Sequence, residues 1–261
     1  MVWLEMKMTI GKIKKMKRIL FSSMAAMLLT AFVGCSNDDD FAITSSKSVE
    51  LNSQDTSQIT CSDPKASYSS EDEYIATVSE TGLITAQRIG ETYIDVNGQK
   101  AVKVTVNPAV TYFTEPQFLF GATKDEVYSK VGTNYSLSNE SGIAYTPTSG
   151  RVKGYLYLLK NGKVAYVVMV VSTSYVNSLT DFLLERYLPA TISYEDYTTL
   201  YINALKPEKA SMIIGEQIYS VSLINVAYMP YTYSASKSRS FNNENDVMEQ
   251  ANDLLNTLNL Q

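Results

Sequence analysis

The chain has 261 residues, with 22 Lys and Arg against 27 Asp and Glu, and its formal net charge is −5. It contains no histidine, which excludes histidine-activated nucleophiles and histidine-ligated metal sites. It also contains no phosphate-binding glycine loop and no dinucleotide fingerprint, so the sequence offers no sign of a nucleotide-dependent enzyme.

The N-terminal region has the pattern of a secretory signal peptide. Lys17 and Arg18 precede an apolar run over residues 19–33, which ends in small residues just before Cys35. The run is shorter than the roughly 20 residues that span a bilayer, so a permanent membrane helix is the weaker interpretation. We expect residues 1–15 to precede the true start at Met16, and residues 1–34 to be an extension and signal peptide.

The end of this apolar run carries a resemblance to a known processing site. The sequence Phe32-Val33-Gly34-Cys35 resembles a bacterial lipoprotein box, although leucine is commonest at the position of Phe32. The resemblance implies that Cys35 becomes the first mature residue and carries lipid, which anchors the protein to the outer membrane. The alternative is an ordinary signal peptide with an incidental cysteine.

An acidic run follows the cysteine. Ser36 and Asn37 lead into Asp38, Asp39 and Asp40. This run resembles the export signal that sends some lipoproteins of Gram-negative gut anaerobes to the outer leaflet, which implies exposure at the cell surface. The alternative is that the aspartates only solvate a tether, which we expect over residues 35–48.

The composition of the mature chain bounds its partners. Residues 1–34 carry six of the basic residues and one of the acidic residues, so the remainder has a net charge of −10. Clustered Lys and Arg are what bind phosphate backbones, and no such cluster remains, so nucleic acid is not an expected partner. Cys61 then has no cysteine partner within the molecule, and we interpret it as a small core residue rather than a reactive thiol.

Residues 49–107 show short β runs separated by turn residues. Asn97-Gly98 favours a type I′ hairpin between the last two runs. Seven such runs predict an immunoglobulin-like β-sandwich. The predicted strands are residues 49–51, 57–61, 65–68, 74–78, 83–86, 92–96 and 101–106.

Three motifs in this region carry a family resemblance. They are SSEDEYIATV at residues 69–78, TGLITA at residues 81–86 and GETYI at residues 90–94. In this order they resemble the group 2 bacterial immunoglobulin-like domain, with Tyr68 where tryptophan is usual. The resemblance implies a spacer or adhesive module on a bacterial surface, and it implies no catalysis.

Residues 108–233 predict an α+β domain, in a chain that is mostly β overall. Thr123 and Glu126 form a capping box for a helix that should end at Gly132. Residues 151–159 and 164–172 should form a hairpin, and the apolar run 166–171 should be a central strand covered on both faces. Sixteen of the 19 tyrosines lie in this domain.

The second half of this domain should continue the same layer. We expect a helix from Ser178, with Asp181 at its cap and Pro189 ending it. Residues 191–204 and 213–228 should then be strands, joined by a turn at Lys206-Pro207-Glu208. The order of elements predicts an antiparallel sheet with helices on one face.

The C-terminal region, residues 234–261, predicts a linker followed by an amphipathic helix. An apolar stripe recurs at helical spacing over residues 242–260. We expect it to pack on the sheet or the sandwich, and the alternative is the groove of a partner protein. The stripe consists of Val247, Met248, Ala251, Leu254, Leu255 and Leu258.

Three groups of residues could in principle carry chemistry. Ser62-Asp63-Pro64-Lys65 matches a Ser-x-x-Lys spelling, but it lacks the helix start which that mechanism needs. Glu185, Glu195 and Asp196 could pair as acids for glycoside hydrolysis, and Glu71-Asp72-Glu73 could bind calcium. Solvated surface charge explains the first carboxylate group equally well, and a charged loop is by far the stronger interpretation of the second, so we expect no catalytic residue, no cofactor and no metal.

Two functions follow from the sequence. The first is a non-enzymatic surface lipoprotein whose tyrosine-rich domain binds a glycan or a protein, since tyrosine offers rigid contact area with a polar group. The second is an outer-membrane accessory or assembly lipoprotein that faces the periplasm and docks a partner through its C-terminal helix.

Overall fold

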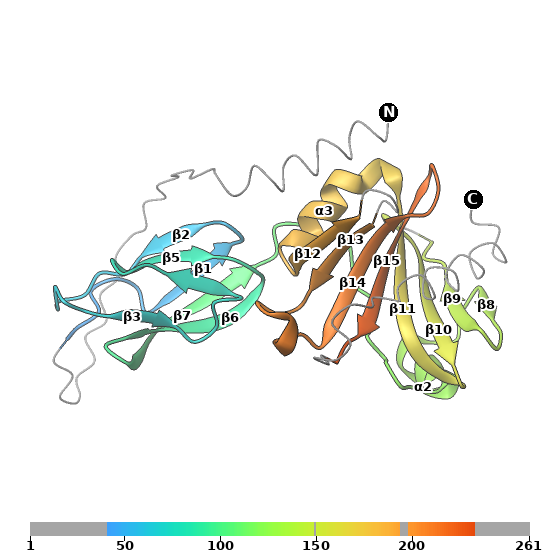
Figure 1. Cartoon of the computed structure of the whole chain (residues 1–261), viewed down its shortest axis with the longest axis horizontal. Coiled ribbons are helices and arrows are strands. Elements are labelled where there is room, and N and C mark those ends of the chain that lie inside the picture. Colours follow the sequence, from blue (N-terminus) through green and yellow to red (C-terminus); the bar gives the residue numbers. More distant parts are fainter. Residues whose placement is uncertain (1–40, 149, 194–197, 233–261) are drawn as a thin grey trace. The chain divides into compact units, whose positions relative to one another are not determined.

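A computed structural model describes residues 41–148, 150–193 and 198–232 of the chain (Figure 1). The chain divides into two compact units, Met1–Asn107 and Pro108–Gln261. Among the described residues, no helix is long and apolar enough to cross a membrane. Cys35, the acidic run and the C-terminal stripe lie outside the described residues.

The first unit is a β-sandwich of two sheets, as the strand pattern predicted. One sheet has the order β1-β7-β6-β3 and the other β2-β5-β4; β1 and β7 pair in parallel, and the remaining pairs are antiparallel. Apolar side chains from both sheets, such as Ile84, Ile94 and Val104, are fully buried in one core. The strands are β1 (Ser48–Asn52), β2 (Thr56–Gln58), β3 (Tyr68–Ser70), β4 (Ala76–Val78), β5 (Leu83–Ala86), β6 (Gly90–Val96) and β7 (Gln99–Asn107).

The predicted hairpin between β6 and β7 is present. Asn97 has φ 51° and Gly98 has φ 77°, the two positive values that a type I′ turn requires. The strand predicted at residues 65–68 instead lies at Tyr68–Ser70. The reason is local, because the Asp63 carboxylate accepts a hydrogen bond from the Lys65 amide (2.9 Å) and so forms a turn in place of a strand.

The second unit is built on one eight-stranded antiparallel sheet with the order β12-β13-β14-β15-β11-β10-β9-β8. The strands β10 and β11 form the predicted hairpin, whose turn places Asn161 at φ 53° and Gly162 at φ 74°. The strands are β8 (Leu137–Ser138), β9 (Gly142–Tyr145), β10 (Val152–Lys160), β11 (Lys163–Ser172), β12 (Leu188–Ser193), β13 (Thr198–Ile202), β14 (Met212–Ile218) and β15 (Leu223–Pro230).

Helices α2 (Lys124–Val131) and α3 (Val176–Leu184) cover the same face of this sheet (Figure 1). On β11, Met169 and Val171 pack with α3, whereas Val168 and Val170 point to the opposite face, and all four are fully buried. The central strand is therefore buried on both faces, as predicted. We call the face opposite the helices the distal face; its buried residues are Ala144, Leu156, Leu158, Tyr166, Val168, Val170, Leu200, Ile202, Ala210, Ile213, Leu223, Ala227 and Met229.

The capping box of α2 is present as predicted. The Thr123 hydroxyl accepts a hydrogen bond from the Glu126 amide (3.4 Å), and the Glu126 carboxylate accepts one from the Thr123 amide (2.7 Å). Gly132 ends the helix with φ 108°, which suits a residue without a β-carbon.

The bounds predicted for the other helix are wrong. A 3₁₀ turn at Thr173–Tyr175 leads directly into α3 at Val176, so Asp181 lies inside the helix and not at its cap. The Ser172 hydroxyl caps this 3₁₀ turn by accepting a hydrogen bond from the Ser174 amide (3.4 Å), and α3 continues from the turn without a side-chain cap of its own. Pro189 does not stop the helix but lies in β12, an edge strand, where a missing amide proton is tolerated.

The two long strands predicted after α3 are each divided. Residues 191–204 contribute to β12 and β13, and residues 213–228 contribute to β14 and β15. The second division occurs because the Ser220 hydroxyl accepts hydrogen bonds from the Ser222 and Leu223 amides and so forms a tight turn. The predicted turn at Lys206-Pro207-Glu208 contains a short 3₁₀ helix, Pro207–Lys209.

Candidate functional site

Glu185, a candidate acid from the sequence, is engaged in holding the start of the second unit. Its carboxylate is 5% exposed and accepts hydrogen bonds from the Ala109 and Val110 amides (2.9 and 3.0 Å) and from Arg186 Nη1 (2.9 Å). The structure therefore gives this side chain three internal partners rather than a neighbouring carboxylate across an open site. Glu195 and Asp196 lie outside the described residues.

A second carboxylate, which is partly buried, lies next to Arg186. Glu115 accepts a hydrogen bond from the Tyr187 hydroxyl (2.5 Å), and its Oε2 lies 3.7 Å from Arg186 Nε. Burial raises the pKa of Glu115, and the hydrogen bond from Tyr187 and the positive charge of Arg186 only partly oppose this. The sequence analysis missed Glu115, because its partners Arg186 and Tyr187 lie 71 and 72 positions further along the chain and no local pattern connects them.

The acidic loop 71–73 is exposed and internally paired. Glu71 forms a 2.7 Å ion pair with Lys100, and the Asp72 carboxylate accepts a hydrogen bond from the Tyr74 amide (2.9 Å). Within the described part of the chain, no group of three or more acidic or sulfur side chains has the arrangement of a metal site.

The Ser-x-x-Lys motif, residues 62–65, lies in a loop of the first unit. The Ser62 hydroxyl accepts a hydrogen bond from the Ala42 amide (2.8 Å), and the side chain of Asn97 donates one to Asp63 (3.0 Å). These bonds secure the N-terminal segment and the β6–β7 turn. Cys61 is partly buried against the sandwich core, which agrees with its interpretation as a small core residue.

Most of the tyrosines in the second unit are structural. Tyr157, Tyr201 and Tyr228 are fully buried on the helix-covered face of the sheet. The Tyr145 hydroxyl donates to the Gly132 carbonyl (2.8 Å), and the Tyr128 hydroxyl bonds to Ser138 (2.6 Å). The high tyrosine content is therefore mainly a packing feature, and it does not by itself mark a binding surface.

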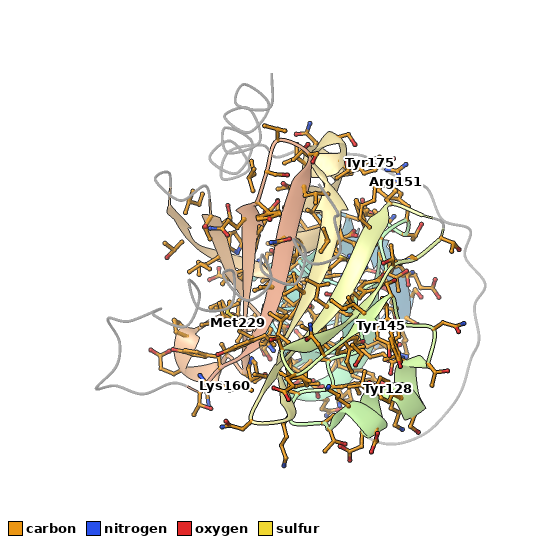
Figure 2. The ribbon with its side chains drawn as sticks, turned by 90° about the vertical axis from the view of Figure 1, so that its right-hand side faces the viewer. Tyr128, Tyr145, Arg151, Lys160, Tyr175 and Met229 are labelled. Carbon is orange, nitrogen blue, oxygen red and sulfur yellow. The ribbon has the colours of Figure 1, made fainter. Side chains whose placement is uncertain are left out.

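A group of aromatic side chains around Arg151 includes the exposed Tyr112. The register of the β10–β11 hairpin, which pairs Val152 with Val171, brings the residue before β10 to the same end of the sheet as the 3₁₀ turn that follows β11. Figure 2 shows Arg151 beside Tyr175 at this end, away from Tyr128 and Tyr145. Tyr112, from the segment before α2, completes the group.

The Arg151 guanidinium stacks on two rings. Its Cζ lies 3.7 Å from the centroid of the Tyr112 ring and 4.8 Å from that of Tyr175. Such stacking is favourable by about 0.5–2 kcal/mol and holds the planar group in a fixed orientation. Tyr112 is 42% exposed, so the group can be reached from solvent.

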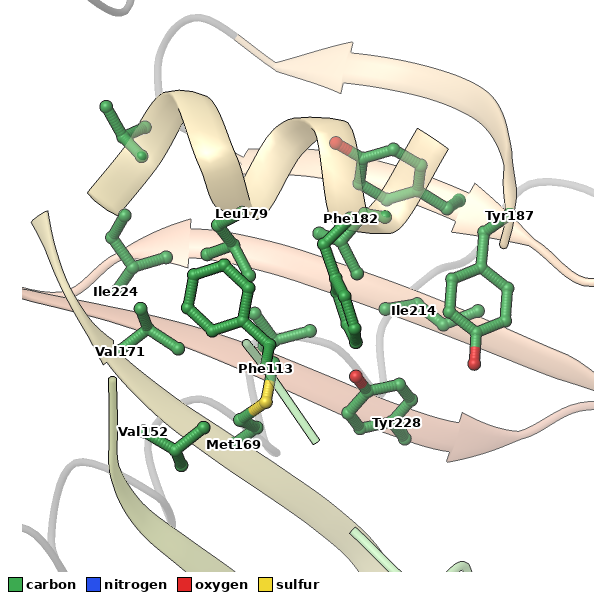
Figure 3. Close-up of a cluster of buried hydrophobic side chains, with 14 of the residues drawn as sticks. Phe113, Val152, Met169, Val171, Leu179, Phe182, Tyr187, Ile214, Ile224 and Tyr228 are labelled. Atoms are coloured by element: carbon green, nitrogen blue, oxygen red, sulfur yellow. The ribbon is translucent and has the colours of Figure 1, made fainter. Parts of the chain in front are cut away.

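The core supports this surface group. Phe113 lies 5.1 Å from Tyr112 and 6.3 Å from Tyr175, and it packs edge-on against Phe182 of α3 at 5.4 Å, all measured between ring centroids. Figure 3 shows Phe113 and Phe182 within the cluster that fills the space between α3 and the sheet. The rings of Tyr112 and Tyr175 are therefore in contact with the packed core through Phe113.

Arg151 has aromatic contacts but no acidic partner in the described part of the chain. None of the ion pairs or hydrogen bonds among residues 41–148, 150–193 and 198–232 involves its guanidinium. A stacked guanidinium with free donors matches a planar carboxylate, which it can bind through two parallel hydrogen bonds. We call Tyr112, Arg151 and Tyr175 the Arg151 surface.

In the first unit, the three sequence motifs lie in the strands of the sandwich and in the turn between β4 and β5. Gly82 has φ +80° and lies against the Tyr68 ring, and the Ser79 hydroxyl accepts a hydrogen bond from the Leu83 amide (3.0 Å) to form the turn.

Comparison with known families identifies the first unit. Residues 39–107 match the bacterial Ig-like domain (group 2). In this Ig-like domain the motifs thus form the β4–β5 turn and the core strands. A search of curated proteins found no match to the chain.

Proposed function

We propose that this protein is a non-enzymatic cell-surface lipoprotein, anchored by lipid on Cys35, whose second unit binds a carboxylate-bearing ligand at the Arg151 surface. The observation that supports a binding role is the partly exposed Arg151, whose guanidinium stacks on two tyrosine rings and has no acidic partner among the described residues. The Ig-like domain supports the location, because modules of this kind suggest surface and adhesion proteins. In this arrangement the Ig-like domain acts as the spacer.

The residue types of the Arg151 surface suit recognition. Tyrosine and arginine are enriched among the residues that contribute most to binding energy, since both offer large contact areas with polar ends. Tyr112 and Tyr175 would contact the apolar parts of a ligand while Arg151 binds its carboxylate. An acidic glycan and an acidic protein segment share this chemistry.

A binding experiment with matched variants tests this surface. The purified chain is applied to an array of acidic and neutral glycans and to a panel of extracellular proteins, followed by Arg151→Ala, Arg151→Lys and the control Lys153→Ala. We expect Arg151→Ala to weaken binding at least about tenfold and Arg151→Lys to weaken it partly, because lysine keeps the charge but loses the planar stack. Lys153 is an exposed cation on β10 outside the stack, so Lys153→Ala should leave binding unchanged. Equal binding by Arg151→Ala and Lys153→Ala would contradict the proposal. Binding to the glycan array or to the protein panel identifies the class of ligand.

The anchoring is tested in cells. The chain is expressed with Cys35 intact or as Cys35→Ala in a related host, and intact cells are stained with an antibody against the second unit. We expect staining only with Cys35, because a lipidated cysteine is what holds the protein at the membrane.

The second candidate, an accessory lipoprotein that faces the periplasm, predicts a different pattern. The protein would fractionate with the membrane in a Cys35-dependent manner, yet intact cells would not stain and would protect it from added protease. The C-terminal stripe, which could dock a partner, favours this candidate.

A further inference from the structure

The distal face of the eight-stranded sheet is apolar and buried. Leu156, Leu158, Val168 and Val170 on this face are all 0% exposed. A sheet with both faces apolar needs a layer on each side, and α2 and α3 supply only one of them. No helix in the described part of the chain contributes a side chain to the distal face.

The chain leaves the sheet on this same face. Met229, near the end of β15, belongs to the distal cluster, and Tyr231 packs against it immediately after the strand. Residues 233–261 follow this point, and they include the apolar stripe of residues 242–260. The sequence therefore supplies an unassigned amphipathic segment directly downstream of an apolar face that lacks a described layer.

The width of the distal face and the length of a helix over residues 242–260 agree. The distal cluster extends from β9 to β13 across six neighbouring strands, or roughly 24 Å at the usual strand spacing. A helix over residues 242–260 would be about 28 Å long. Residues 233–241 can reach roughly 30 Å when extended, which is enough to place that helix anywhere on the face.

We propose that residues 242–260 form a helix that packs by its apolar stripe on the distal face of the same molecule. The second unit then has three layers, with α2 and α3 on one side of the sheet and the C-terminal helix on the other. On this proposal the stripe is part of the fold and is not a site for a partner protein, so it no longer favours the candidate that faces the periplasm.

A matched pair of variants in the full chain tests the proposal. Leu254→Asp with Leu255→Asp adds two charges to the stripe, and Asn256→Asp with Thr257→Asp adds the same charges outside it. We expect the first variant to accelerate amide hydrogen exchange in β10, β11 and β15 at least about tenfold, because the distal face loses its cover. The second variant should exchange like the unmodified chain. Unchanged exchange in the first variant, or equal acceleration in both, would overturn the proposal.

Photo-crosslinking identifies what the stripe contacts. A photoreactive amino acid is placed at Leu255 of the full chain, and the crosslinked peptides are sequenced. Intramolecular crosslinks to β10, β11, β13 or β15 support the proposal. Crosslinks to residues 41–107, to a second copy or to another protein, or the lack of any crosslink to these strands, would overturn it.

Discussion

At the scale of single residues, Gly82 shows why the Ig-like motif requires a glycine. Its φ of +80° disfavours any side chain, and a β-carbon there would lie 2.9 Å from Tyr68 Cζ and 3.2 Å from the Ile59 carbonyl oxygen. The Tyr68 ring therefore occupies the space that a side chain at Gly82 would need. A residue with a β-carbon is excluded both by the backbone and by its neighbours.

Replacing Gly82 should destabilise the Ig-like domain more than replacing a glycine with space around it. Gly98 has a similar φ of +77° but no atom within 4 Å of its β-carbon position. We expect Gly98→Ala to cost about 1 kcal/mol from backbone strain and Gly82→Ala about 2 kcal/mol or more, because the Tyr68 ring must also move. Hydrogen exchange of the β5 and β6 amides measures both. Equal costs would mean that the Tyr68 contact contributes nothing.

Glu216 should make the stability of the second unit depend on pH. It is buried beside Tyr201, whose hydroxyl donates to it at 2.8 Å, and burial raises the pKa of Glu216 to about 7 from its ordinary value of 4.5. Between these two values the unfolded chain has released a proton that the native state keeps, so the free energy of unfolding falls as pH rises. The full decrease from about pH 4 to pH 8 is on the order of 3 kcal/mol.

The matched variant for this pH dependence is Glu216→Gln, which cannot titrate. Urea unfolding between pH 4 and 8 should show a flatter profile for the variant than for the original chain. Burial also raises the pKa of Glu115, so this residue makes the free energy of unfolding depend on pH in both proteins. The contribution of Glu216 is therefore the difference between the two profiles. Identical profiles would assign the pH dependence to other groups.

At the scale of elements, α3 shows how a helix start can be misplaced from sequence. Asp181 has the residue type of a cap, but α3 continues directly from a 3₁₀ turn that Ser172 caps, and Asp181 lies exposed within the helix. Phe182, the next residue, is fully buried between α3 and the sheet (Figure 3). Neighbouring residues therefore have opposite roles.

These roles predict opposite effects on stability. We expect Phe182→Ala to cost about 3–5 kcal/mol, because it leaves a cavity in the core, and Asp181→Ala to change stability by less than about 0.5 kcal/mol. If Asp181 acted as a cap, its substitution would cost about 1 kcal/mol. Thermal unfolding of the two variants separates these possibilities.

At the scale of the whole molecule, the proposed surface location depends on a short acidic run. We expect replacement of Asp38, Asp39 and Asp40 by Asn to leave membrane fractionation unchanged, since Cys35 is intact, but to abolish most antibody staining of intact cells. The matched control replaces three exposed glutamates of the Ig-like domain, Glu71, Glu73 and Glu80, by Gln, which changes the net charge equally. Loss of staining in both variants would indicate a general effect of charge rather than a sorting signal.

Features governed by neighbours in sequence were accessible from the sequence alone. The capping box of Thr123 and Glu126, the Asn-Gly turns and the burial of β11 on both faces each follow from residues close together in sequence, and the structure confirms them. The mostly β fold, with a sandwich and an antiparallel sheet covered by helices, follows from such local patterns.

Only the tertiary structure brought the candidate site together. Tyr112, Arg151 and Tyr175 are separated by 24 to 39 residues, and the register of the β10–β11 hairpin together with the packing of Phe113 places them in contact. The role of Glu185 likewise depends on distant residues. Its carboxyl group suggested a catalytic acid, but in the structure it accepts hydrogen bonds from the amides of Ala109 and Val110. Local sequence determines which backbone shapes are favourable, whereas contacts between distant residues depend on how strands pair and layers pack, and no local pattern contains that information.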